Sequence, residues 1–179
     1  MNFNVVLISF LFIFQPFQVL YSLGEEVKEY DLKAAFLYHF TKYFEWQGLE
    51  EIPFFEIDIL GESEILEPLK EIAEKKLVFG KPLKVKKIET LKQIDKPQII
   101  FISKFSKFEI SGVLKKTENL KTLIVGEEEG LCLQGVAVNF VIRDGNLRFE
   151  INERALKIAG IKPSSQIMKL AVSLFGNRE

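Results

Sequence analysis

Residues 98–125 read QIIFISKFSKFEISGVLKKTENLKTLIV, and this stretch decides the class of fold. It contains two short apolar runs, 98–103 and 121–125, and between them residues 104–116 follow a helical pattern despite Gly112. A short strand that is apolar throughout is typical of a parallel sheet with both faces covered. The strand–helix–strand order therefore predicts an α/β fold.

Toward the N-terminus, strands and helices continue to alternate. Residues 54–60 and 83–88 predict strands, and residues 64–76 between them predict a helix. Residues 25–46 predict a long first helix that ends before Gly48. Apolar residues lie on two faces of this helix, and both faces need a cover. The protein's own core can cover both, or one face can contact a second subunit or a partner protein.

Toward the C-terminus, the pattern predicts an antiparallel hairpin. Residues 135–143 and 146–151 are strand-like, and Asp144-Gly145 between them tolerates the positive φ angles of a two-residue turn. Asn152 is a suitable N-cap for a short helix at 153–159.

The last element that the sequence predicts is a helix after Pro163, capped by Ser164 or Ser165 and carrying Leu174 on its apolar face. The sequence contains no internal repeat and no interdomain linker. Together, the elements predict one domain in which a mostly parallel sheet, ending in the antiparallel hairpin, is covered by helices on both sides.

The first residues of the chain predict export. Residues 1–24 contain no Lys, Arg, Asp or Glu, and residues 5–14 (VVLISFLFIF) form an uninterrupted apolar run. This run has the length of a signal-peptide core but falls short of the roughly 20 apolar residues of a membrane span. We therefore expect a signal peptide at 1–24, cleaved near Gly24, and a folded domain at 25–179. A buried first strand or an uncleaved anchor are the alternatives.

The composition limits the chemistry that the chain can perform. The chain has 24 Lys and Arg against 25 Asp and Glu, and this net charge of −1 gives no reason to expect nucleic acid or an anionic membrane as partner. His39 is the only histidine and Cys132 the only cysteine, which excludes a histidine-rich metal site and an internal disulfide. We expect both residues to be structural. Because the sequence also carries no catalytic or cofactor-binding motif, we expect a binding protein and not an enzyme, with no metal and no cofactor.

One chemical alternative lies at the ends of two predicted strands. Gly61 follows the strand 54–60 and Gly126 follows the strand 121–125, at the sheet edge where α/β proteins bind their ligands. Glu127-Glu128-Glu129 comes next and could hold a divalent ion or a basic ligand, although a solvated acidic loop is commoner. The alternative function is thus a small-molecule-binding or hydrolytic domain with its site near Gly61 and Gly126.

Two segments resemble a known family. Residues 32–46 (LKAAFLYHFTKYFEW) look like the opening helix of the YfiR-like periplasmic family, and residues 148–171 resemble its closing strand and helices. This resemblance implies a three-layer Rossmann-like sandwich located in the periplasm. His39 and Gln47 stand where the family usually has Asn and Pro, and the lone Cys132 means that the disulfides of the family's namesake cannot form.

The resemblance also implies a function. The namesake is a dimer that represses a membrane-bound diguanylate cyclase through the cyclase's periplasmic sensor domain. We therefore expect a periplasmic regulator whose partner is the periplasmic domain of an inner-membrane diguanylate cyclase or sensor kinase. A homodimer is also expected from the resemblance. Aromatic side chains dominate the binding energy of interfaces, so we predict that Phe36, Phe40, Tyr43 and Trp46 contact the partner. The alternative, above all for Phe40, is that they fill the core.

Overall fold

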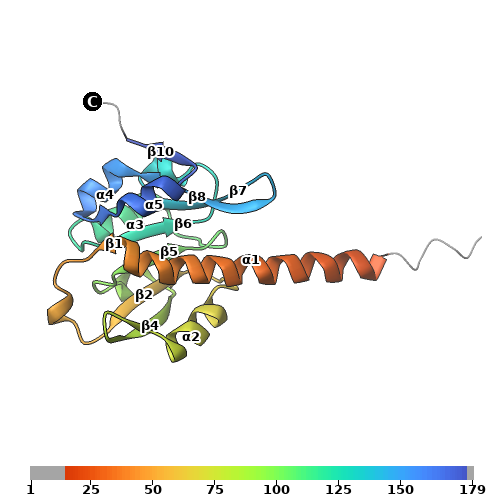
Figure 1. The fold of residues 1–179 in the computed structure, drawn as a ribbon, viewed down its shortest axis with the longest axis horizontal. Helices are drawn as coiled ribbons and strands as arrows, with labels where there is room; N and C mark the ends of the chain where they lie inside the picture. Colours follow the sequence, from red (N-terminus) through yellow and green to blue (C-terminus); the bar gives the residue numbers. More distant parts are fainter. Residues whose placement is uncertain (1–14, 177–179) are drawn as a thin grey trace, which may run out of the picture.

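The computed structural model describes the backbone of residues 15–176 and the side chains of residues 28–176 (Figure 1). Its main sheet has the strand order β10-β8-β7-β6-β5-β2-β4-β3. The strands are β2 (Phe55–Leu60), β3 (Leu77–Val78), β4 (Lys81–Ile88), β5 (Ile99–Ile102), β6 (Leu123–Gly126), β7 (Val138–Arg143), β8 (Asn146–Asn152) and β10 (Ser173–Phe175). Neighbouring strands run parallel except in the β7–β8 and β3–β4 pairs.

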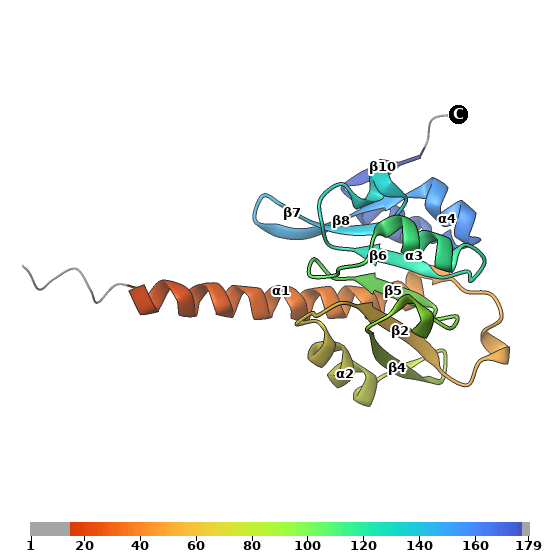
Figure 2. The same ribbon diagram turned by 180° about the vertical axis from the view of Figure 1, so that it is seen from behind.

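Helices lie on both faces of this sheet. They are α1 (Gln15–Tyr43), α2 (Leu66–Lys75), α3 (Ile110–Thr117), α4 (Glu153–Ala159) and α5 (Ser165–Leu170), with the 3-10 helices η1 (Leu49–Glu51), η2 (Leu91–Gln93) and η3 (Leu131–Gln134). Figure 1 shows α1 in front of the sheet, and Figure 2, seen from behind, shows α3 on the opposite face. The predicted three-layer α/β sandwich is confirmed.

Two apolar cores, one on each face, hold the layers together. Because successive side chains of a strand point to opposite faces, Phe55 and Ile57 of β2 lie in the larger core with α1, α2, α4 and α5. Leu60 of β2 and Ile100 of β5 lie in the smaller core, together with Val113 of α3. Strands buried on both faces explain the unbroken apolar runs in the sequence.

The first helix differs from its prediction at both ends. It begins at Gln15 and not at residue 25, because a single glycine such as Gly24 costs about 1 kcal/mol and does not end a helix. It ends at Tyr43, since Phe44–Glu45 forms strand β1, which pairs with β9 (Lys162–Pro163). Residues 15–24 of the predicted signal peptide are thus helical, and residues 1–14 lie outside the described part. In Figure 1 the N-terminal part of α1 projects away from the α/β body.

The segment before α3 is a loop and not helix. The prediction of a helix from residue 104 is wrong, since α3 begins only at Ile110. Ser103 causes part of the difference: its hydroxyl accepts a hydrogen bond from the backbone N–H of Phe105 and donates one to the carbonyl of Glu62. Side chain-to-backbone bonds of this kind compete with helix formation and favour a turn.

The C-terminal hairpin is confirmed, including its turn. Asp144 and Gly145 both have positive φ, 52° and 70°, as a two-residue turn requires. Asn152 caps α4, because its Oδ1 accepts a hydrogen bond from the N–H of Ala155 at 2.9 Å. Ser164 caps α5 in the same way.

The last predicted helix is too long. Helix α5 ends at Leu170, and Leu174 lies in strand β10 instead of on the helix. Strand β10 runs parallel to β8, with Leu174 opposite Ile151. The edge of β8 offers backbone hydrogen bonds that the chain satisfies by extending, and no local pattern could reveal this long-range pairing.

Candidate functional site

The four aromatic residues predicted to contact a partner do not form one surface. Phe40 is fully buried in the larger core, where its ring stacks on Phe140 at 5.8 Å between centroids and meets Phe149 edge-on at 5.4 Å. The prediction that Phe40 contacts a partner is therefore wrong, and the core-packing alternative applies. The helical period assigns Phe40 to one face of the helix, but it does not indicate whether the sheet or solvent covers that face.

Trp46 and Tyr43 lie at the C-terminal end of α1. The indole N–H of Trp46 donates to the carbonyl of Thr41 at 2.7 Å, and its ring meets Phe55 edge-on at 5.0 Å. Both Trp46 and Tyr43 are half-buried against the larger core. Much of each ring thus packs within the domain. Contact of the remaining ring surface with a partner stays a prediction.

Phe36 lies on the side of α1 that faces the β7–β8 hairpin. Its ring centroid is 6.0 Å from that of Phe140 and 5.7 Å from that of Phe149. The ring is half-buried, so it closes the core at this point and still reaches the surface. Of the four predicted residues, Phe36 is the one that continues into an exposed apolar surface.

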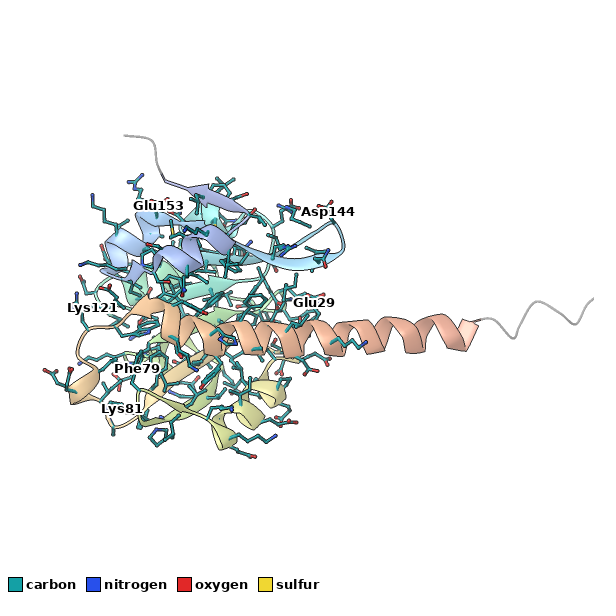
Figure 3. The ribbon with its side chains drawn as sticks, in the orientation of Figure 1. Glu29, Phe79, Lys81, Lys121, Asp144 and Glu153 are labelled. Atoms are coloured by element: carbon teal, nitrogen blue, oxygen red, sulfur yellow. The ribbon has the colours of Figure 1, made fainter. Side chains whose placement is uncertain are left out.

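That surface, which we call the helix–hairpin surface, consists of Leu32, Phe36, Ile142 and Leu147. Leu32 lies one helical turn before Phe36, and Ile142 lies two residues beyond Phe140 on the same face of the sheet, opposite Leu147. Leu32 is 52% exposed and Ile142 is 48% exposed. Figure 1 shows the hairpin and α1 projecting from the body in the same direction, and Figure 3 places Asp144 and Glu29 on this side.

The acidic run after β6 has a structural role at its first position. Glu127 is buried and pairs with the buried Lys33 of α1, with Nζ and Oε2 2.5 Å apart. The hydroxyl of Tyr30 and the backbone N–H of Lys104 donate to its Oε1 at 3.4 and 2.9 Å. The expectation of a solvated loop is wrong for Glu127, whereas Glu128 and its neighbour Glu129 are exposed.

The ion pair holds α1 over the end of β6, at the sheet edge where a ligand was the alternative. Lys33 is held from its other side by Glu29, one turn earlier on α1, so α1 itself covers the end of β6. Within the described residues, no group of three or more His, Cys, Asp or Glu side chains is arranged to hold a metal ion. The structural role of Glu127 is therefore to anchor α1.

Gly61 and Gly126 are glycines because of close packing. A Cβ on Gly61 would lie 2.8 Å from the Cα of Ser106, and a Cβ on Gly126 would lie 2.4 Å from the Cδ1 of Leu131. The chain's own loops therefore occupy the space next to both residues. A cavity of about 450 Å³ does lie nearby, beside α3, and Glu128 is among its lining residues, but neither glycine lines it. The cavity nearest the predicted position is thus lined by the residues that pack on these glycines, among them Ser106 and Leu131.

The two singly occurring residues differ in exposure. Cys132 is buried, as expected, and burial raises the pKa of its thiol to about 12, which makes the thiolate scarce at neutral pH. His39 is exposed on α1, with its ring between those of Tyr38 and Tyr43 at 5.9 and 6.3 Å. An exposed imidazole on a helix, beside two phenol rings, provides no catalytic arrangement by itself.

Sequence reasoning missed Asp58. This residue of β2 is fully buried, and neither of its carboxylate oxygens has a hydrogen-bond partner among the described residues. Burial, and secondly the nearby carboxylate of Glu56, raise the pKa of Asp58 to about 7. The signal in the sequence is the run FFEIDIL, in which two acidic residues interrupt an otherwise apolar strand.

The fold and these sites first define the class of protein, a three-layer α/β domain in which a buried ion pair anchors α1 over the end of β6. A family model, DUF4154, described as YfiR/HmsC-like, matches residues 30–172, and the chain belongs to this family. The resemblance seen in the opening helix and the closing segment is confirmed.

One solved structure supports the fold. The chain is similar to the ABC domain from Streptococcus pneumonia in complex with L-Trp, with 15% identity and a TM-score of 0.51 over 68% of this chain and 55% of that chain. A conserved domain protein from Vibrio cholerae O1 biovar eltor has 14% identity and a TM-score of 0.49, over 70% of this chain and 56% of that chain. The chain thus spans little more than half of either protein. No curated protein matches it.

In the part of the chain that the structure describes, no helix combines the length and the apolar character that crossing a bilayer requires.

Proposed function

We propose that this protein is a periplasmic regulator that binds the periplasmic portion of an inner-membrane signalling protein and holds its signalling back. The observation that carries the proposal is membership of the YfiR/HmsC-like family across residues 30–172. Membership supports a regulatory and not a catalytic role, and it makes a diguanylate cyclase the first candidate partner, with a sensor kinase the second. The signal peptide predicted at 1–24 would deliver the domain to that compartment.

The helix–hairpin surface is the contact that we assign to this partner. Leu32 and Ile142 expose large apolar side chains, and Phe36 packs against the larger core. Covering one such side chain in an interface contributes about 1.5–3 kcal/mol, so two of them with a half-buried aromatic ring could form a hot spot.

The direct test is capture of the partner's periplasmic domain by the exported protein. If the gene beside this protein's gene encodes a membrane-bound GGDEF-type protein, the periplasmic domain of that cyclase is the bait. If the neighbouring gene encodes a sensor kinase, the periplasmic domain of the kinase is used instead. We expect binding by the wild type and a loss of at least about thirtyfold in the Leu32→Glu/Ile142→Glu variant, as removal of a hot spot causes. The Tyr43→Ala variant tests whether the other end of α1 contributes.

A matched control separates this surface from general disruption. Ile158 on α4 is also a large exposed apolar residue, and Ile158→Glu should bind as the wild type does. Failure of the wild type to bind either candidate partner contradicts the proposed function. If the Leu32→Glu/Ile142→Glu variant instead turns a dimer into a monomer and still binds, the surface joins two copies of this chain.

A further inference from the structure

The hairpin between β3 and β4 contains an unexplained aromatic residue. Val78 of β3 pairs with Lys81 of β4, so Phe79 and Gly80 are the two residues of the turn. Both have positive φ, 51° and 76°. Such a turn favours Asn-Gly, because the Cβ of a bulky residue crowds the backbone in the left-handed region. Folding alone therefore gives no reason for a phenylalanine here.

The ring of Phe79 is also turned to solvent. Phe79 is 56% exposed and Leu77 is 58% exposed, while Val78 between them is buried and anchors the hairpin in the larger core. The hydroxyl of Tyr38 donates to the carbonyl of Leu77 at 3.3 Å, which ties β3 to α1. Figure 3 shows Phe79 at the end of the molecule opposite the projecting part of α1. Two large apolar side chains are thus presented on a fixed tip.

The residues around the tip in the sequence are rich in lysine, which the net charge of −1 conceals. Residues 75–88 contain six lysines and no Asp or Glu. Lys84 pairs with Glu56 and Lys87 with Glu62, so these two are partly neutralised. The lysines next to the exposed apolar pair are Lys75, Lys76 and Lys81, of which Lys75 approaches Glu71 at 3.6 Å.

We propose that the β3–β4 hairpin docks on an anionic lipid surface. Phe79 and Leu77 enter the headgroup region, and the lysines beside them meet the lipid phosphates. Exposed aromatic and aliphatic side chains flanked by lysines are the composition of segments that bind the membrane interface, and each lysine near an anionic leaflet adds to the attraction. A stable protein interface needs about 800 Å² on each partner, which a convex tip with two apolar side chains does not supply.

The test uses the exported protein and vesicles of two compositions. We expect it to sediment with vesicles of phosphatidylcholine and phosphatidylglycerol, not with vesicles of phosphatidylcholine alone, and to be released by salt. Phe79→Asn places a residue that tolerates the left-handed region at the turn, so the variant should keep its melting temperature. Its binding to the anionic vesicles should fall at least about tenfold, because the ring provides much of the buried area.

Charge and position are tested separately. Replacing Lys75, Lys76 and Lys81 with Gln should weaken vesicle binding roughly fivefold for each lysine. Phe105→Asn, which removes an exposed ring elsewhere, should bind as the wild type does. The proposal is overturned if the wild type does not sediment with anionic vesicles, or if Phe79→Asn binds them equally well. It is also overturned if neither the wild type nor the hairpin variants bind vesicles and the variants lose binding to an acidic protein instead.

Discussion

At the scale of single residues, Asp58 stands out because its surroundings do not neutralise it. Lys84 and Lys86 lie opposite Glu56 and Asp58 on the neighbouring strand β4. The ammonium group of Lys84 pairs with Glu56 at 2.7 Å, and that of Lys86 donates to the carbonyl of Gln93 at 2.8 Å. Asp58 thus remains without a direct cation, and this explains why burial raises the pKa of its carboxyl group to about 7.

This raised pKa predicts how stability depends on pH. The folded protein holds a proton on Asp58 up to about pH 7, whereas the unfolded chain loses it near the ordinary value of 3.8. The folded state therefore binds more protons between these values, and stability falls as pH rises through this window and levels off above it. Between about pH 5 and about pH 8, we expect a loss of about 3 kcal/mol in the free energy of unfolding, measured with urea.

Substitution isolates the contribution of this carboxyl group. Asp58→Asn cannot ionise, so the free energy of unfolding of this variant should be nearly flat over the same interval. Asp95→Asn, at an exposed position, should retain the wild-type slope. A slope that persists in Asp58→Asn would show that other groups cause it.

At the scale of elements, the chain fixes α1 to the sheet by more than apolar contact. Lys33 and Glu127 join α1 to the end of β6, and the backbone N–H of Lys104 brings the loop after β5 to the same carboxylate. This geometry holds α1 over the end of β6 and fixes the rotation of α1 about its axis. That rotation in turn decides which residues, Leu32 and Phe36 among them, reach the helix–hairpin surface.

Substitution of one or both members of the ion pair measures this connection. Glu127→Gln leaves Lys33 buried without its full counter-charge and should cost about 3 kcal/mol of the free energy of unfolding. The Lys33→Met/Glu127→Leu variant removes both charges and should recover much of that loss. Lys70→Met, in the exposed pair with Glu67, should change stability by no more than about 1 kcal/mol. Equal losses in the single and the double variant would mean that the pair acts only through packing.

At the scale of the whole molecule, the body of the domain and the projecting start of α1 are separable. The residues of α1 that enter the larger core begin at Tyr30 and continue through Ala34 and Leu37 to Phe40. Residues 15–24 precede all of them and project from the body in Figure 1. Removal of residues 1–24 therefore leaves these core contacts of α1 in place.

This separation predicts the mature form of the protein. Protein released from the periplasm should have the mass of a chain beginning near Glu25, and it should unfold in one cooperative transition. A chain beginning at Ala35 loses Tyr30 and the Lys33–Glu127 pair, and it should be several kcal/mol less stable. Recovery of exported protein with residues 1–24 still attached would contradict the predicted cleavage.

The order of the longer elements could be predicted from the sequence, because its signals are local. Apolar runs marked the strands, Asp144-Gly145 marked the turn of the hairpin, and Asn152 marked the start of α4, each through the conformations that a few neighbouring residues allow. The family could be recognised for the same reason, since its motifs lie in the opening helix and the closing segment.

Only the tertiary structure decided what each side chain faces. The helical period assigned Phe36 and Phe40 to a helix surface, but the sheet covers Phe40 completely and Phe36 in part. The run of glutamates looked solvated until α1 brought Lys33 to Glu127, residues 94 positions apart in the chain. Burial, ion pairing and strand neighbours depend on contacts between distant segments, and a sequence pattern reports only the local conformation that each segment prefers.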